Sequence, residues 1–185
     1  MVDKQIDGQL FQNILDEEYL NFDARLESDV ERLLLRNELN VALAESVTGG
    51  LVGYRLVCRP GASRYFLGGV TCYNTGLKMK LCRVKPETVR QHGVVSTDVA
   101  LEMAHGVRTL MNSDIGVSTT GEAGPVASSQ DNDDVGRVCV SVVTDHHDQS
   151  QEYQFRGSRS IVLYDTVRVV FSMLRDCVRQ LERRK

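Results

Sequence analysis

The alternation of hydrophobic and polar residues predicts a regular series of helices and strands from residue 24 onward. Apolar residues three and four positions apart predict helices over 24–36, 51–57 and 97–111 and a closing helix that starts after Ser158. Short apolar runs predict strands over 41–44, 65–73, 115–119, 137–144 and 152–156. Shorter helices are expected around Lys78 and from Pro86 onward. The order of these elements is typical of an α/β protein.

This order predicts a three-layer α/β/α domain with a mixed central sheet, because crossover connections come first and an antiparallel hairpin comes last. We assign this domain to residues 24–185. Residues 1–23 are more polar and acidic, but their apolar positions are spaced as in an amphipathic helix, which predicts an N-terminal helical arm. The arm and the closing helix suggest a homo-oligomer, with a dimer favoured, although both could pack on their own domain.

The two longest predicted helices each carry an apolar stripe. The stripe of the helix over 97–111, which Ser96 caps, is expected to be buried and contains Val99, Leu101, Met103, Ala104, Val107 and Leu110. The stripe of the closing helix is interpreted as a core or dimer contact and contains Leu163, Val167, Val170, Leu174, Cys177 and Leu181.

Composition narrows the classes of function. A chain of 185 residues with 42% hydrophobic content is long enough for one buried core. Its net charge of -3 argues against nucleic-acid binding, because a duplex binder needs a basic face. We expect no membrane contact, since the chain has no apolar run of about 18 residues and no signal-peptide pattern.

The cysteines and histidines indicate neither disulfides nor a metal site. The five cysteines are widely spaced and form no C-x-x-C pair, which suits reduced thiols and a cytoplasmic location. His146 and His147 are adjacent but lack partner ligands, so a solvated turn is the simpler interpretation. We therefore expect no metal and no cofactor.

The stretch Ala44–Gly50 is the first candidate for chemistry, because it joins a predicted strand to a predicted helix. The first N–H groups of a helix lack intrahelical partners and attract anions, and Gly49 and Gly50 would let a ligand approach the backbone. Ser46 and Thr48 supply hydroxyls there. A plain helix cap by either hydroxyl explains the same pattern without any function.

Other polar side chains follow the second and third predicted strands. Tyr73 and Lys78 come after the second strand, and Thr119, Thr120 and Gly121 end the third. Because the carboxyl ends of parallel strands meet at one edge of a sheet, these groups are expected to share a cleft. A hydroxyl nucleophile could be activated there by a lysine or tyrosine, with backbone N–H groups stabilising an oxyanion. The alternative is that Lys78 lies on a solvated helical face.

Several known catalytic patterns are missing. The chain contains neither a G-x-S-x-G nucleophile elbow nor a G-x-x-x-x-G-K-[ST] phosphate loop, and His92 and His105 are isolated. A Ser-His-Asp triad and a nucleoside triphosphatase are therefore not supported.

Five motifs in series resemble the C-terminal domain of the competence/damage-inducible protein CinA, a family that includes nicotinamide mononucleotide deamidase. The family's A-E-S-C-T-G-G is matched by Ala44–Gly50, and its P-G-S-S-x-x-F-x-G-G-V by residues 60–70. The motifs Y-S-N-x-x-K, H-G-A-V-S and T-G-I-A-G-P are matched by residues 73–78, 92–96 and 120–125.

The resemblance implies a reaction and a set of site residues. The implied reaction is hydrolysis of the carboxamide of nicotinamide mononucleotide to nicotinic acid mononucleotide and ammonia, with a small pyridine nucleotide as the ligand and without a metal. The resemblance implies Ser46 as nucleophile, with Tyr73, Lys78 and Thr120 as activating or polar partners. The substrate-binding residues it implies are Glu45, Thr48, Gly49, Gly50, Thr119, Gly121 and Gly124.

The chain departs from the family pattern at several positions. Val47 stands in place of a cysteine, Thr75 and Gly76 replace Asn and Glu, and Glu122 replaces an apolar residue. Residues 126–134 form an acidic segment where the family has a glycine-rich loop with a lysine. Carboxylates beside a phosphate repel it, so the competing hypothesis is a non-catalytic relative that binds a nucleotide or a protein partner.

Overall fold

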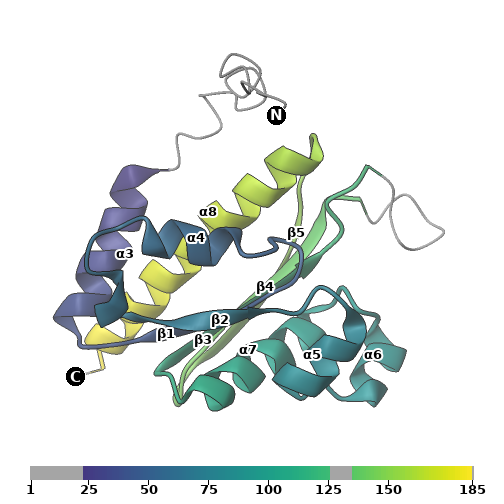
Figure 1. Ribbon diagram of the computed structural model, residues 1–185, viewed down its shortest axis with the longest axis horizontal. Coiled ribbons are helices and arrows are strands. Elements are labelled where there is room, and N and C mark those ends of the chain that lie inside the picture. Colours follow the sequence, from purple (N-terminus) through teal and green to yellow (C-terminus); the bar gives the residue numbers. More distant parts are fainter. Residues whose placement is uncertain (1–22, 126–134, 185) are drawn as a thin grey trace, which may run out of the picture.

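The structure is a computed structural model, and it describes residues 23–125 and 135–184. The N-terminal arm predicted for residues 1–23 lies outside the described residues except for Asp23, and the acidic segment 126–134 lies outside them entirely. The described residues form one sheet with helices on both faces (Figure 1). This confirms the predicted three-layer α/β/α architecture.

The sheet is mixed, as predicted. Its described strands are β1 (Val41–Glu45), β2 (Phe66–Thr71), β3 (Ile115–Gly121), β4 (Arg137–Val143) and β5 (Asp148–Gln154), in the order β2-β1-β3-β4-β5. Strand β1 is parallel to both neighbours, with Glu45 opposite Thr71 and Thr119. Strands β3, β4 and β5 are antiparallel. The carboxyl ends of β1, β2 and β3 therefore lie at the same edge.

The helices divide between the two faces of the sheet (Figure 1). One face is covered by α3 (Ala24–Arg36), α4 (Leu51–Val57) and α8 (Arg159–Glu182). The other face is covered by α5 (Thr75–Cys82), α6 (Pro86–His92) and α7 (Thr97–Met111). A short 3₁₀ helix spans Ala62–Arg64, just before β2. The chain leaves β1 through α4 on one face and leaves β2 through α5 to α7 on the other. The carboxyl ends of the neighbouring strands β1 and β3 thus form the topological switch point, which is where α/β sheets bind ligands.

Strand β1 separates two hydrophobic cores, because successive side chains of a strand point to opposite faces. Val41 and Leu43 pack with α3, α4 and α8, whereas Ala42 and Ala44 pack with α5 and α7. The small alanines let α7 approach closely. A Cβ added to Gly116 of β3 would lie 2.2 Å from the carbonyl oxygen of Ala104 in α7, so helix and strand meet backbone to backbone.

The caps and boundaries largely agree with the sequence pattern. The side chains of Ser96 and Ser158 accept hydrogen bonds from the N–H groups of Val99 and Ile161, as expected for N-caps of α7 and α8. Strand β2 ends at Thr71, before Tyr73, and β5 begins at Asp148, which makes the hairpin connection shorter than predicted.

The prediction that Leu110 is buried was wrong, and the apolar stripe of α8 is found in the core of the chain. Leu110 is 52% exposed, because in the last turn of α7 Met111, four residues after the buried Val107, packs against the core instead. Leu101 is only partly buried. In α8 the central apolar residues Val167 to Cys177 are buried in the core of the same chain. None of the described helices is long and apolar enough to cross a membrane.

Candidate active site

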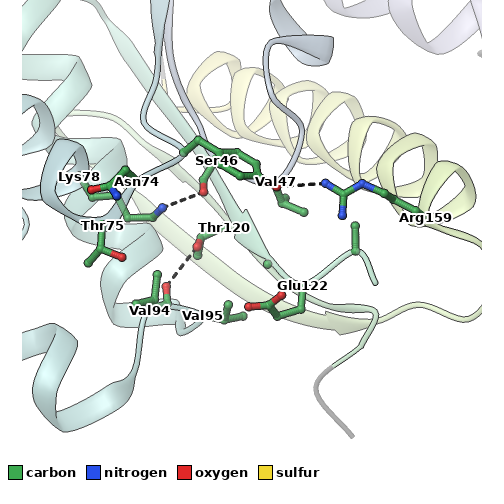
Figure 2. A pocket seen from close by; sticks show the side chains of 13 residues that line it. Ser46, Val47, Asn74, Thr75, Lys78, Val94, Val95, Thr120, Glu122 and Arg159 are labelled. Atoms are coloured by element: carbon green, nitrogen blue, oxygen red, sulfur yellow. Dashed lines mark hydrogen bonds between the residues drawn. The ribbon is translucent and has the colours of Figure 1, made fainter. Parts of the chain in front are cut away.

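A cavity of about 300 Å³ lies at the carboxyl ends of β1 and β3, at the switch point of the sheet (Figure 2). Its lining comes from segments far apart in sequence: Ser46, Val47, Tyr73, Asn74, Thr75, Lys78, Val94, Val95, Thr120, Gly121, Glu122, Ala123 and Arg159. All four residues that the resemblance implies in catalysis belong to this lining. The prediction of a shared cleft is confirmed for these four residues and Gly121, but not for Thr119, which is buried and outside the lining.

Ser46 and Lys78 form a buried pair in this cavity. The Nζ atom of Lys78 donates to the Ser46 Oγ atom at 2.7 Å and to the carbonyl oxygen of Cys72 at 2.9 Å. Ser46 is 6% exposed and Lys78 only 1%. The alternative that Lys78 lies on a solvated face is therefore wrong. A buried amine in contact with a hydroxyl is the arrangement that lysine-activated nucleophiles require.

The charge of Lys78 is set by opposing effects. Burial lowers its pKa, whereas the nearby thiols of Cys72 and Cys82 and the carboxylate of Glu122 act in the opposite direction. The net shift of the Lys78 pKa is downward. The neutral amine, which can accept a proton from a hydroxyl, is therefore populated at lower pH than in a solvated lysine.

Local structure fixes both members of the pair. The N–H group of Ser46 donates to the carbonyl oxygen of Thr119 at 2.9 Å, so Ser46 extends the ladder between β1 and β3 by one residue. Helix α5, which carries Lys78, begins at an N-cap where the Asn74 side chain accepts from the N–H group of Gly76 at 2.8 Å. The replacement of a family Glu by Gly76 thus leaves this cap intact.

Glu45 occupies the position where an anion was expected. Its Oε2 atom accepts from the Thr48 hydroxyl at 2.6 Å and from the N–H groups of Gly50 and Val52 at 2.9 and 3.1 Å. Its Oε1 atom accepts from the N–H group of Gly53 at 2.8 Å. The free N–H groups at the start of α4 are therefore bonded to a carboxylate of the chain itself.

The rest of this turn lies beside the cavity rather than in its lining. Thr48, Gly49 and Gly50 border a neighbouring hollow together with Tyr54 and Tyr164. Gly49 and Gly50 have φ of 62° and 111°, which the turn requires and which side chains disfavour. The Thr48 hydroxyl lies 2.8 Å from that of Thr119, which is 1% exposed. These contacts stabilise the turn that carries Ser46.

Two backbone donors next to Ser46 remain available. Within residues 23–125 and 135–184, the N–H groups of Val47 and Thr48 have no hydrogen-bond partner, whereas that of Gly49 donates to the carbonyl oxygen of Ser46. Val47 lines the cavity. An N–H group directly after a nucleophile is a common oxyanion donor, so Val47 is better placed for this role than Gly49, whose N–H group is already bonded.

The end of β3 forms the opposite wall of the cavity. The Thr120 hydroxyl donates to the carbonyl oxygen of Val94 at 3.1 Å, and Gly121 and Glu122 follow in the lining. Figure 2 shows the Glu122 carboxylate directed toward Val95 on this side of the cavity. Gly124 is not part of the lining, but its carbonyl oxygen accepts from Arg159 at 2.9 Å.

Arg159 is a cavity residue that the sequence analysis missed. It is the first residue of α8, and its Nη2 atom donates to the Tyr73 hydroxyl at 3.1 Å. Tyr73 is 62% exposed and its hydroxyl contacts Arg159, not Lys78. In sequence, Arg159 is one basic residue among several in an amphipathic helix. A cation just after the N-cap Ser158 was the available signal.

In the part of the chain that the structure describes, no group of three or more His, Cys, Asp or Glu side chains could hold a metal ion. The polar side chains that line the cavity carry hydroxyl, amide, amine, guanidinium and carboxylate groups.

Residues 23–178 match the family model of the CinA C-terminal domain. The chain is 45% identical over 126 residues to a CinA-like protein of Chlorobaculum tepidum, covering 68% of this chain and 30% of that protein. It is 35% identical over 153 residues to a CinA-like protein of Fervidobacterium nodosum, covering 83% and 37%. The chain thus spans less than half the length of these relatives.

A solved structure agrees with the sequence matches. The crystal structure of a CinA superfamily protein from Klebsiella pneumoniae is similar with a TM-score of 0.80 and 26% identity. The similarity covers 84% of this chain and 97% of that one.

Proposed function

The chain belongs to the CinA C-terminal domain family, and on that premise we propose that its cavity hydrolyses the carboxamide of nicotinamide mononucleotide. The products are nicotinic acid mononucleotide and ammonia. The observation that carries the proposal is the 2.7 Å hydrogen bond between the buried amine of Lys78 and the hydroxyl of Ser46. A non-catalytic binding module would not require a lysine buried at such cost.

The first half of the reaction forms an acyl-enzyme. Neutral Lys78 takes the proton of Ser46 as its Oγ atom attacks the amide carbon. The N–H group of Val47, which lines the cavity, is suited to stabilise the oxyanion of the tetrahedral intermediate. The protonated Lys78 then returns its proton to the leaving nitrogen, which departs as ammonia and leaves an ester on Ser46.

The second half regenerates the enzyme. A water molecule loses a proton to Lys78 and attacks the ester carbon, and collapse of the second tetrahedral intermediate returns the hydroxyl of Ser46. The carboxylic acid formed loses its proton to solvent. Overall, one amide and one water give one carboxylate and one ammonium ion.

The charges on the cavity wall suit a zwitterionic nucleotide. Arg159 offers a guanidinium group next to the N-terminus of α8, which suits the phosphate of the substrate. Glu122 places a carboxylate in the same cavity, where it attracts the cationic pyridinium ring. The same carboxylate repels the carboxylate of the product. Glu122, the departure from the family pattern that favoured a non-catalytic relative, thus also fits catalysis.

The proposal is tested by measuring ammonia and nicotinic acid mononucleotide after incubation with the substrate. Ser46→Ala is expected to lower kcat at least about a thousand-fold, and Lys78→Met at least about a hundred-fold. Exposed residues give matched controls: Ser63→Ala for the hydroxyl and Lys80→Met, on the same helix as Lys78, for the amine. Both controls should retain wild-type rates.

Two results would overturn the proposal. One is ammonia release that Ser46→Ala leaves unchanged. The other is a wild-type protein that binds nicotinamide mononucleotide in calorimetry but releases no ammonia, which would identify a nucleotide-binding module instead.

A further inference from the structure

Two thiols lie directly behind the Ser46–Lys78 pair. The Sγ atoms of Cys72 and Cys82 are 3.9 Å apart, and the two residues are 0% and 1% exposed. Both are linked to Lys78. The carbonyl oxygen of Cys72 accepts from the Lys78 Nζ atom at 2.9 Å, and Cys82 follows Lys78 by one helical turn in α5. The proposed reaction does not use either thiol.

We propose that Cys72 and Cys82 are an oxidation site, which hydrogen peroxide converts into a disulfide that disables the Ser46–Lys78 pair and that a dithiol reductant reopens. The disulfide itself is independent of the function proposed above. Only its consequence for amide hydrolysis rests on that function.

The surroundings favour Cys72 as the thiol that reacts first. The pKa of Cys72 is lowered by its hydrogen bond with Cys82 and by the charge of Lys78, which together outweigh its burial. The thiolate of Cys72 attacks peroxide and becomes a sulfenic acid, with release of hydroxide. The sulfur of Cys82 then attacks that of Cys72 and displaces the hydroxyl group of the sulfenic acid, which leaves as water with the proton of the Cys82 thiol. In sum, two thiols and one peroxide give one disulfide and two waters.

The other cysteines lack this arrangement. Burial raises the pKa of Cys139 to about 12 and that of Cys177 to about 11, which suppresses their thiolates. Cys58 is exposed and can react with peroxide, so it is replaced with Ser in the experiment below. Among the described cysteines, Cys72 and Cys82 are the pair placed for an intramolecular disulfide.

Closing the disulfide is expected to shift a group that holds Lys78. A disulfide bond is about 2.05 Å long, so the sulfur atoms must approach by nearly 2 Å. Cys82 has little room to move, because a Cβ on Gly106 of α7 would lie 1.8 Å from its carbonyl oxygen. Any backbone shift that accompanies closure therefore falls mainly on Cys72, whose carbonyl oxygen holds the Lys78 amine. A misplacement of about 1 Å can cost about a hundred-fold in rate.

The experiment uses the full chain with Cys58→Ser, compared with Cys58→Ser/Cys82→Ser and, should the latter fold poorly, Cys58→Ser/Cys82→Ala. Each protein is incubated with hydrogen peroxide over a time course, since burial makes the reaction slow. Samples are then alkylated under denaturing conditions and digested with trypsin. Three readouts follow: the cross-linked peptide joining residues 65–78 to 81–83, the rate of acetylation of Lys78 relative to exposed Lys80, and amide hydrolysis.

The expected result is the cross-linked peptide, a changed acetylation rate of Lys78, and a loss of amide hydrolysis of at least about tenfold that dithiothreitol restores. The Cys82 variants should keep their activity through the same treatment. Absence of the cross-linked peptide would overturn the proposal. So would a cross-link that changes neither the acetylation of Lys78 nor hydrolysis. If even the untreated protein does not hydrolyse the amide, the proposed function fails. The cross-linked peptide and the acetylation rate of Lys78 then still test the proposal that Cys72 and Cys82 are an oxidation site.

Discussion

Replacing Glu45 with Gln tests whether this side chain is a structural cap rather than a ligand contact. The substitution preserves shape but exchanges one carboxylate oxygen for an NH₂ group, which cannot accept a hydrogen bond. Glu45 is 4% exposed, so solvent cannot replace the lost bonds. Its four hydrogen bonds hold the Thr48 hydroxyl and three N–H groups at the start of α4.

The expected loss of stability depends on how the side-chain amide of the introduced Gln is oriented. With NH₂ in the place of Oε1, only the bond from Gly53 is lost, whereas the opposite orientation loses three bonds from Oε2. The first orientation is therefore favoured. It leaves one buried donor facing another, which costs about 1–3 kcal/mol, and weakens the remaining bonds by removing the charge. We expect the free energy of unfolding to fall by about 2–4 kcal/mol.

The assay is urea denaturation followed by circular dichroism, with Tm as a second readout that should fall by about 2–4 °C per kcal/mol. Glu87→Gln is the matched control, because that side chain is 62% exposed and pairs only with Arg90 in the same helix. The control should stay within about 0.5 kcal/mol of wild type. Equal unfolding midpoints for Glu45→Gln and wild type would refute the capping role.

Two further predictions concern the charges of the cavity. Because neutral Lys78 is the base, kcat/KM should rise as the pH increases through the lowered pKa of Lys78. Glu122→Gln removes a negative charge that favours the ammonium form of Lys78, so this rise should move to lower pH. A pH–rate profile of Glu122→Gln that stays in place or moves to higher pH would contradict this role of Glu122. Arg159→Ala should raise KM for nicotinamide mononucleotide about tenfold to a hundred-fold with little change in kcat, and an unchanged KM would exclude Arg159 as the phosphate contact. Removing the phosphate from the substrate should make wild type and Arg159→Ala equal.

The order of elements could be predicted because each has its own hydrophobic period. The strands around Leu43 and Val117 lie between two helical layers and read as apolar runs, whereas α8 repeats every three or four residues. The end of α7 was predicted, but the buried residue of its last turn was not, because whether Leu110 or Met111 faces the core depends on where the sheet lies beneath that turn. Period alone does not carry that information.

The residues of the cavity also include some that the sequence could place and others that it could not. Ser46, Lys78 and Thr120 could be placed together, because parallel strands bring their carboxyl ends to one edge. The contact between Arg159 and Tyr73 joins residues 86 positions apart and depends on how α8 crosses the sheet, which no local pattern encodes. The role of Glu45 could be considered but not decided from the sequence, because a free helix N-terminus predicts an anion without indicating whether that anion is a ligand or a side chain of the same chain.

The burial of Lys78 links the stability of the protein to its chemistry. In the unfolded chain this lysine keeps its proton up to its ordinary pKa, whereas in the folded protein burial lowers that pKa. Between the two values the unfolded chain binds more protons, so Lys78 makes the folded state less stable at neutral pH than at alkaline pH. The same penalty supplies a neutral amine beside Ser46. The rigid turn that Glu45 caps helps to offset this cost and keeps the hydroxyl of Ser46 within reach of the amine.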